Sequence, residues 1–125
     1  MLLPYSNINI YDNSRASVVS CISLLRNTKK SGATIGQVFI CSIKKVNLKN
    51  KNLKLKKGSI CSVLFIKMNR NLKRYGLVYL KSNLNGGILI NSDNLPVASR
   101  LFGVIYKEVK DLNFLKVALL AEFLV

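Results

Sequence analysis

The chain has 125 residues, half of them hydrophobic, and carries 20 Lys and Arg against five Asp and Glu, so its formal net charge is +15. This length and apolar content predict one folded domain over residues 1–125 and exclude a chain that is disordered throughout. The charge excess indicates a polyanionic partner, and no apolar run reaches the ~18 residues that a membrane-spanning helix needs.

The positive charge is concentrated in residues 13–92, which contain sixteen Lys and Arg and no Asp or Glu. The same stretch contains apolar runs typical of strands, namely SVVSCISLL, QVFICSI, SICSVLFI and GILI. A membrane-surface protein usually carries its charge on an amphipathic helix, whereas this charge lies in and between predicted strands. We therefore expect nucleic acid, and no membrane, as the partner.

The first third of the chain predicts three strands, at residues 5–10, 17–25 and 36–46. A turn with the sequence Asp-Asn-Ser separates the first two, and a basic loop separates the second from the third. In the third strand Phe39, Cys41 and Ile43 share one face, and the opposite face is also apolar at its start. Burial on both faces indicates the wall of a closed barrel.

Residues 44–58 read KKVNLKNKNLKLKKG and contain seven lysines without an acid. Leucines at positions 48, 53 and 55 argue against a plain disordered tail, and the pattern predicts a projecting two-stranded ribbon with its turn near residues 50–52. The alternative is a solvated, self-repelling loop. We favour a ribbon that contacts phosphates, because seven uncompensated lysines destabilise a free surface.

Residues 59–67 predict a further strand, and residues 68–75 a second basic connection. Its Tyr75 suits either stacking on a base or packing over the barrel end, and we favour packing. The last strands are predicted at residues 76–81 and 87–91, joined by a tight hairpin at Asn85 and Gly86.

From residue 99 the apolar period becomes helical, with Leu101, Ile105 and Val109 on one stripe. Ser99 is the expected N-cap of this helix, and Asp111 that of a second helix over residues 112–124. The second helix is apolar nearly all round, so it must be buried against the barrel or a partner.

Catalytic chemistry has no candidate in this sequence, which contains no His and no nucleophile or phosphate-loop motif. Cys21, Cys41 and Cys61 stand alone, which argues against a zinc site or a disulfide framework and favours buried thiols in a reducing compartment. We expect no enzyme activity, no cofactor and no metal.

Five segments resemble the universal large-subunit ribosomal protein fourteen family in its bacterial and organellar form. They read DNSRA from Asp12, KKGSICSVLFIK from Lys56, NGGILIN from Asn85 and PVASRLFGVIYKEVK from Pro96, followed by FLKVALLAEFL. The resemblance spans almost the whole chain, although Arg15 stands where the family has glycine.

The resemblance implies a small five-stranded barrel with a projecting ribbon and short C-terminal helices at about residues 99–124. It implies a structural role in translation: binding to large-subunit rRNA, contact with neighbouring large-subunit proteins, and a face toward small-subunit rRNA that a ribosome-silencing factor also uses. The positions on that face are Ser99, Arg100 and Lys116.

We predict that the RNA-binding residues lie on the first turn and on the basic connections: Asn13, Ser14, Arg15, Lys29, Lys30, Lys44, Lys45, Lys49, Lys51, Lys54, Lys56, Lys57, Lys67, Arg70, Lys73 and Arg74. The competing interpretation is a free-standing barrel that binds single-stranded nucleic acid. Frequent Asn and Lys without Trp are typical of AT-rich organellar genomes, so we expect the mitochondrial ribosome, with a plastid or the bacterial cytoplasm as alternatives.

Overall fold

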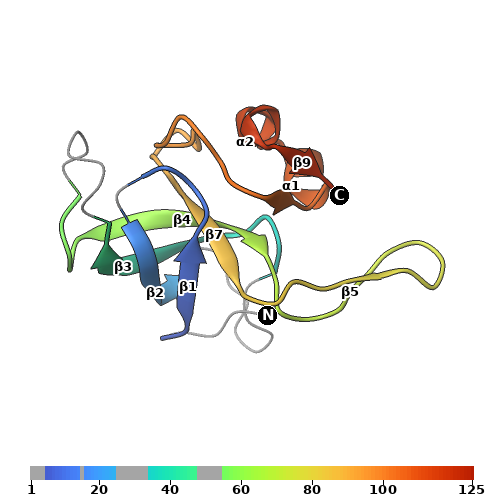
Figure 1. The fold of residues 1–125 in the computed structure, drawn as a ribbon, viewed down its shortest axis with the longest axis horizontal. Coiled ribbons are helices and arrows are strands. Elements are labelled where there is room, and N and C mark those ends of the chain that lie inside the picture. The colour runs from blue at the N-terminus through green and yellow to red at the C-terminus, as the bar shows by residue number, and fades with distance from the viewer. Residues whose placement is uncertain (1–4, 15, 25–33, 48–54) are drawn as a thin grey trace.

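The computed structural model describes residues 5–14, 16–24, 34–47 and 55–125. Five strands form a closed barrel in the order β1-β2-β3-β4-β7 (Figure 1). The pairs are antiparallel except for β1 and β7, which run parallel and close the barrel. The strands are β1 (Asn7–Ile10), β2 (Ala16–Leu24), β3 (Val38–Val46), β4 (Ile60–Lys67) and β7 (Gly86–Ile90). This confirms the prediction of a mainly β protein built on a five-stranded barrel.

The barrel interior is filled by the alternate residues of its strands, as a pleated wall requires. Phe39, Cys41 and Ile43 of β3 are fully buried, as predicted, while Val38 and Ile40 are partly buried. Phe39 also meets Phe65 of β4 edge to face, with ring centroids 6.3 Å apart. These two rings are the largest fully buried side chains in the described part of the chain and fix the centre of the core.

Glycine is needed where β7 passes between β1 and β4. A Cβ atom added at Gly87 would lie 2.5 Å from Val63 Cγ1 and 3.1 Å from the Leu64 carbonyl oxygen. Such contacts are far inside van der Waals distance, so a larger residue would push β7 away from β4. The two glycines of the NGGILIN segment therefore allow the barrel to close tightly.

A short ribbon projects from the barrel, formed by β5 (Leu72–Lys73) and β6 (Tyr79–Leu80) (Figure 1). The predicted hairpin at Asn85 and Gly86 is therefore wrong, because β6 pairs back with β5 and not forward with β7. Asn85 instead accepts a hydrogen bond from the Asn69 N–H, 2.9 Å long, and so helps to hold the base of the ribbon.

The ribbon predicted within residues 44–58 is described only in part. Lys44 and Lys45 extend β3, and the Gly58 N–H donates to the Ile43 carbonyl over 2.8 Å, so the two sides still approach each other. Its predicted turn lies outside the described residues.

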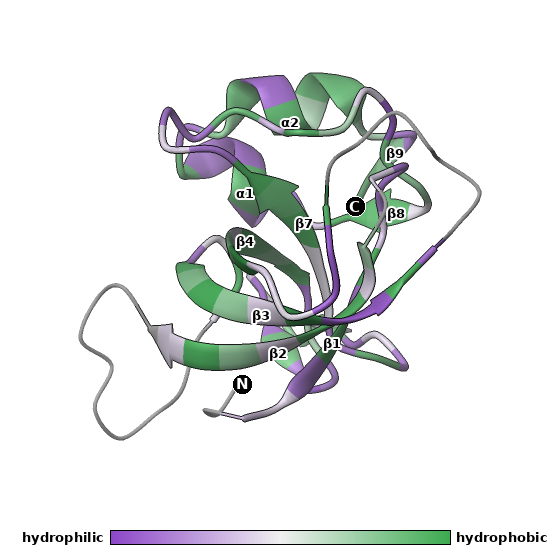
Figure 2. Cartoon of the chain, turned by 90° about the vertical axis from the view of Figure 1, so that its left-hand side faces the viewer, coloured by the Kyte–Doolittle hydropathy of each residue, from purple (hydrophilic) through white to green (hydrophobic). Residues whose placement is uncertain are grey.

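The C-terminal unit runs β8 (Val104–Ile105), α1 (Glu108–Asp111), α2 (Leu115–Leu120) and β9 (Phe123–Leu124), and β8 and β9 pair in parallel. It covers one side of the barrel (Figure 2), and its Ile105, Val109 and Val117 are buried in the same apolar core.

The predicted helices are wrong in extent, and neither Ser99 nor Asp111 is an N-cap. Residue 101 pairs with residue 12 in an isolated bridge, and β8 pairs with β9, so backbone groups in both segments are already bonded outside a helix. The second helix was expected to be buried against the barrel or a partner. Only part of its surface is buried within the protein, so burial of the rest against a partner stays a prediction. Val117 and Ala118 are buried, whereas Leu119 is 84% exposed.

Candidate nucleic-acid interface

Four predicted RNA-binding lysines gather at one end of the barrel: Lys44, Lys45, Lys56 and Lys57. We call this set the lysine end. The first two lie near the C-terminal end of strand β3, and the other two come just before Gly58, whose φ of +87° favours glycine. All four side chains are exposed. The lysine end thus presents closely spaced cations that suit a phosphate backbone.

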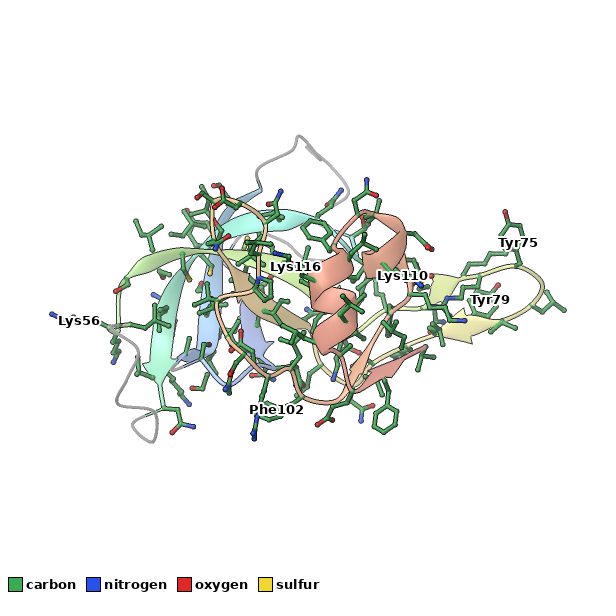
Figure 3. All side chains as sticks on the ribbon, turned by 90° about the horizontal axis from the view of Figure 1, so that it is seen from above. Lys56, Tyr75, Tyr79, Phe102, Lys110 and Lys116 are labelled. Carbon is green, nitrogen blue, oxygen red and sulfur yellow. The ribbon has the colours of Figure 1, made fainter. Side chains whose placement is uncertain are left out.

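The ribbon carries a second group of candidates at the opposite end of the molecule. Figure 3 shows Tyr75 and Tyr79 on the far side of the molecule from Lys56. Tyr75 is fully exposed, so the predicted packing over the barrel end is wrong. Exposed Lys73 lies two residues before Tyr75 in the sequence. Cations next to exposed aromatic rings can contact both phosphates and bases.

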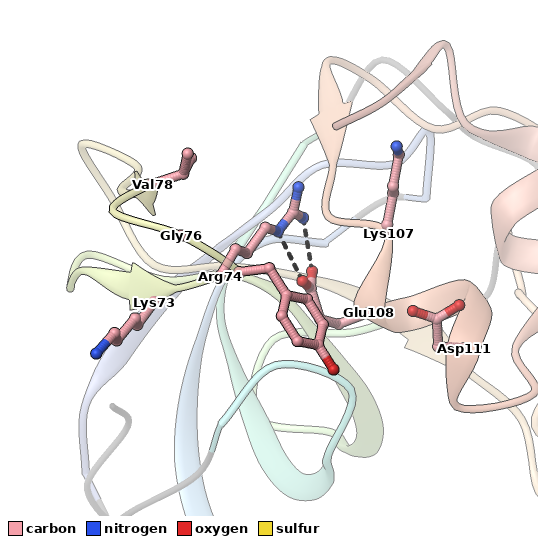
Figure 4. Close-up of a pocket in the computed structure, with 8 residues that line it drawn as sticks. Lys73, Arg74, Gly76, Val78, Lys107, Glu108 and Asp111 are labelled. Atoms are coloured by element: carbon pink, nitrogen blue, oxygen red, sulfur yellow. Dashed lines mark hydrogen bonds and ion pairs between the residues drawn. The ribbon is translucent and has the colours of Figure 1, made fainter.

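Arg74 occupies a different position from the other ribbon cations, because its guanidinium turns toward α1 (Figure 4). Arg74 Nε donates to Glu108 Oε1 and Nη2 donates to Oε2, both over 2.8 Å. Nη2 also donates to the Val125 carbonyl oxygen over 2.5 Å. Arg74 therefore fastens the ribbon to the C-terminal unit. Its predicted role in RNA binding stays a prediction.

An open groove of about 930 Å³ lies around this ion pair, between the ribbon and α1. Burial raises the pKa of Glu108, but hydrogen bonds from Arg74 and from the backbone, together with the charges of Arg74 and Lys107, outweigh it and leave the pKa lowered. The carboxylate is thus held ionised and neutralises one of the cations nearby. The groove is lined by Lys73, Arg74, Tyr75, Gly76, Val78, Lys107, Glu108 and Asp111.

The side chains of Asp12 and Ser14 in the DNS turn make hydrogen bonds within the protein and face away from solvent. The Asp12 carboxylate is buried and accepts hydrogen bonds from the Ser14 N–H (2.9 Å), the Ser14 hydroxyl and the Leu89 N–H (3.1 Å). Burial raises the pKa of Asp12, and these hydrogen bonds oppose that effect. Ser14 is also buried, so its side chain supports the turn against β7.

Asn13 connects the DNS turn to the segment that holds two predicted partner-face residues. Asn13 Nδ2 donates to Ser99 Oγ over 3.0 Å, and the Arg100 N–H donates to Asn13 Oδ1 over 3.1 Å. The Asn13 N–H donates to the Arg100 carbonyl oxygen over 3.1 Å. A residue predicted to bind RNA is therefore in contact with two residues predicted for the partner face. The sequence pattern around either segment does not indicate this contact.

Lys67 is the least accessible of the described lysines that we predicted to bind RNA. Its Nζ lies 3.9 Å from the centre of the Tyr11 ring, in cation–π geometry. Burial lowers the pKa of its ammonium group. Lys67 therefore contributes to packing at the end of β4.

Lys116 is exposed on α2 and borders a shallow groove of about 370 Å³. Ala98, which directly precedes Ser99, also lines this groove. The predicted partner-face residues Ser99, Arg100 and Lys116 therefore belong to neighbouring segments. The remaining apolar lining comes from Leu95, Pro96, Leu119 and Leu120.

Six predicted RNA-binding residues lie outside the described part of the chain: Arg15, Lys29, Lys30, Lys49, Lys51 and Lys54. Among the residues that are described, no group of three His, Cys, Asp or Glu side chains is arranged to hold a metal ion. Within the same residues, no helix has the length and apolar character needed to cross a membrane. Exposed Tyr79, Lys81 and Lys107 were not among the predicted residues. Tyr79 lies on the ribbon, Lys81 directly follows it, and Lys107 lines the groove beside it, positions that no local sequence pattern indicates.

Comparison with known proteins gives matches over nearly the full length. A family model described as Ribosomal protein L14p/L23e matches residues 1–125. A protein of Acanthamoeba castellanii named large ribosomal subunit protein uL14m is 37% identical over 120 residues, covering 92% of this chain and 92% of that protein. A protein of Acanthamoeba polyphaga with the same name is 37% identical over 107 residues, covering 82% and 91%.

Proposed function

The chain belongs to the ribosomal protein L14p/L23e family, and we propose that it is an rRNA-binding structural component of the large subunit of the mitochondrial ribosome. The observation that carries the proposal is the family match over residues 1–125. The name uL14m of both relatives supports the large subunit and the mitochondrion.

The lysine end and the ribbon are the parts that contact rRNA in this proposal. They lie at opposite ends of the molecule (Figure 3), so one barrel bridges two separate RNA segments. Lys56 and Lys57 neutralise phosphates at one end. Lys73 does so at the other, where Tyr75 stacks on an unpaired base.

The segment fastened by Asn13 faces the small subunit in this proposal. Ser99, Arg100 and Lys116 are exposed and lie on neighbouring segments, beside the apolar groove at Leu119. Cations beside an apolar groove suit both small-subunit rRNA and a protein such as a ribosome-silencing factor. Neighbouring large-subunit proteins complete the partners.

A free-standing barrel that binds single strands is not favoured. Such barrels stack bases on aromatic side chains of their outer strands, whereas Phe39 and Phe65 have no exposed surface. Of the exposed tyrosines, Tyr75 and Tyr79 lie on the ribbon, away from the barrel wall, and Tyr5 precedes β1 as a single exposed ring.

Sedimentation of an affinity-tagged chain expressed in its own cells tests the proposed function. The tagged chain is expected to co-sediment with large subunits and with whole mitochondrial ribosomes. Its presence in free small subunits, or only in ribosome-free fractions, would contradict the proposal.

The salt dependence of rRNA binding tests the lysine end separately. Lys56→Gln with Lys57→Gln is expected to reduce the slope of log affinity against log salt by about 1.5 to 2, since each lost phosphate contact removes roughly one unit or slightly less. Lys110→Gln, an exposed change on α1, serves as the control and should leave the slope nearly unchanged. Equal slopes for the double variant and the unmodified chain would exclude phosphate contact by these lysines.

A further inference from the structure

The three cysteines form a row across three neighbouring barrel strands. Cys21 of β2 pairs directly with Cys41 of β3, which pairs directly with Cys61 of β4. Directly opposed residues in antiparallel strands project to the same face with Cβ atoms roughly 4.5–5.5 Å apart. All three are free thiols. Each strand contains one cysteine, and the register of strand pairing brings the three cysteines side by side.

The second pair in this row is already in contact. Cys41 Sγ lies 3.3 Å from Cys61 Sγ, and the thiols can share a hydrogen bond. Direct cross-strand partners have Cα separations within the range that a disulfide spans. Joining the two sulfurs therefore needs side-chain rotation but no change of strand register.

The two thiols differ in access and acidity. Cys41 is fully buried, whereas Cys61 is partly exposed near the start of β4, beside the 72% exposed Ile60. The hydrogen bond from Cys41 lowers the pKa of Cys61 against the opposing effects of burial and of Asp12. The same hydrogen bond and burial raise the pKa of Cys41. Cys61 is thus the accessible nucleophile and Cys41 its buried neighbour.

We propose that Cys41 and Cys61 form a peroxide-sensitive dithiol, which hydrogen peroxide converts to a disulfide between β3 and β4. The Cys61 thiolate attacks one peroxide oxygen, the O–O bond breaks, and the released hydroxide takes up a proton to become water. Cys61 is left as a sulfenic acid. The Cys41 sulfur then attacks the Cys61 sulfur, and the Cys41 proton leaves with the sulfenic hydroxyl as a second water. Two thiols and one peroxide give one disulfide and two waters.

Cys21 is the competitor for Cys41 and also an internal control. Burial raises the pKa of Cys21, so it stays protonated and shielded. Cys41 and Cys61 are 20 residues apart in sequence, and the numbers of Cys21 and Cys41 differ by the same 20. An unfolded chain therefore closes either loop with equal probability. Any preference between these pairings reports the folded structure.

The disulfide would fix the base of the lysine end, because the connection that bears Lys56 and Lys57 lies between the two cysteines. It would covalently link β3 to β4, the two strands that flank the connection bearing Lys56 and Lys57. The modification site is independent of the proposed place in the ribosome, since it rests on the barrel register alone.

Peptide mapping of the purified, folded full chain tests this proposal. The chain is treated with one equivalent of hydrogen peroxide, its remaining thiols are blocked with maleimide in urea, and it is digested with trypsin without reduction. The three cysteines fall in three tryptic peptides, residues 16–26, 31–44 and 58–67. Mass spectrometry of the linked peptides therefore identifies each pairing.

The expected product is the Cys41–Cys61 link, at least tenfold more abundant than Cys21–Cys41, with Cys21 recovered as its maleimide adduct. The same oxidation in urea should give the two links in equal yield. Cys21→Ser should leave the Cys41–Cys61 yield unchanged, and Cys61→Ser should abolish it. A Cys21–Cys41 link of equal or greater yield in the folded chain would overturn the proposal, as would three free thiols after peroxide treatment. The folded-to-urea comparison needs no variant, so it decides the matter even where a serine variant fails to fold.

Discussion

Arg74 binds Glu108 through two parallel hydrogen bonds, each 2.8 Å long. The arginine follows β5 and the glutamate opens α1, so this pair joins the projecting ribbon to the C-terminal unit. Both side chains are partly screened from water, with 23% and 31% of their surface exposed. A two-point geometry in such surroundings fixes orientation as well as distance.

The pair is expected to stabilise the fold by about 1 kcal/mol, more than an ordinary surface ion pair because it is bidentate and partly buried. A double-mutant cycle with Arg74→Gln and Glu108→Gln, followed by urea unfolding, measures this coupling. A parallel cycle with Lys73→Gln and Glu108→Gln is the control and should show no coupling. Additive effects of Arg74→Gln and Glu108→Gln would contradict the prediction.

Acid should weaken this contact. The pKa of Glu108 in the folded protein is lowered from its ordinary value of 4.5. Its contribution to the free energy of unfolding is therefore complete above the ordinary pKa and is lost as pH falls through the lowered pKa. The free energy of unfolding is measured between pH 6 and pH 3, about one to two units on either side of the ordinary pKa. It should fall less steeply with acid in Glu108→Gln than in the unmodified chain. Parallel curves for the two proteins would exclude this role for Glu108.

Asp12→Asn is expected to destabilise the protein by about 1–3 kcal/mol, the usual cost of leaving buried hydrogen-bonding groups without suitable partners. Both carboxylate oxygens accept hydrogen bonds, from Ser14 and from Leu89, and an amide supplies only one acceptor oxygen. Thermal unfolding measures the loss. Asp93→Asn, at an exposed turn, is the matched control and should unfold like the unmodified chain.

Gly87→Ala should destabilise the barrel by about 1–3 kcal/mol through overpacking against Val63 and the Leu64 carbonyl. Gly58→Ala meets no neighbouring atom within 4 Å, although its φ of +87° adds backbone strain. Its cost should therefore be about 1 kcal/mol. Equilibrium unfolding of both variants compares the two effects, and an equal or larger loss for Gly58→Ala would show that close packing at β7 is not limiting.

Tyr75→Ala is expected to change the free energy of unfolding by less than about 0.5 kcal/mol, because an exposed side chain makes few contacts to lose. The side chain is fully exposed. Phe65→Ala, in the core, should cost about 3–5 kcal/mol. Chemical denaturation distinguishes them. A large loss of stability in Tyr75→Ala would place its ring against the protein.

The barrel strands could be predicted because β2, β3 and β4 are eight or nine residues long and rich in apolar residues. The family could be predicted from the DNSRA, NGGILIN and C-terminal segments, and the full-length family match confirms it. The absence of enzyme activity follows, since the family consists of structural ribosomal proteins.

The ribbon and the C-terminal unit were predicted less well for a physical reason. Strands β5, β6, β8 and β9 have two residues each, too few for any periodicity. The helical spacing of Leu101, Ile105 and Val109 is real, but these residues reach the core from three differently bonded segments. The hydrogen bonds of Asn13 with Ser99 and of Arg74 with Glu108 join residues that are far apart in sequence, so no local sequence pattern predicts them.

The parallel seam between β1 and β7 has a consequence for how the molecule matures. Asn9 pairs with Gly86, so the second edge of β1 is covered only after β7, the last strand of the barrel in chain order, has been made. Until then the nascent barrel is an open sheet whose unpaired backbone can recruit strands from other chains. Pairing of β7 with both β1 and β4 is therefore the step that covers the exposed edges of the unfinished barrel.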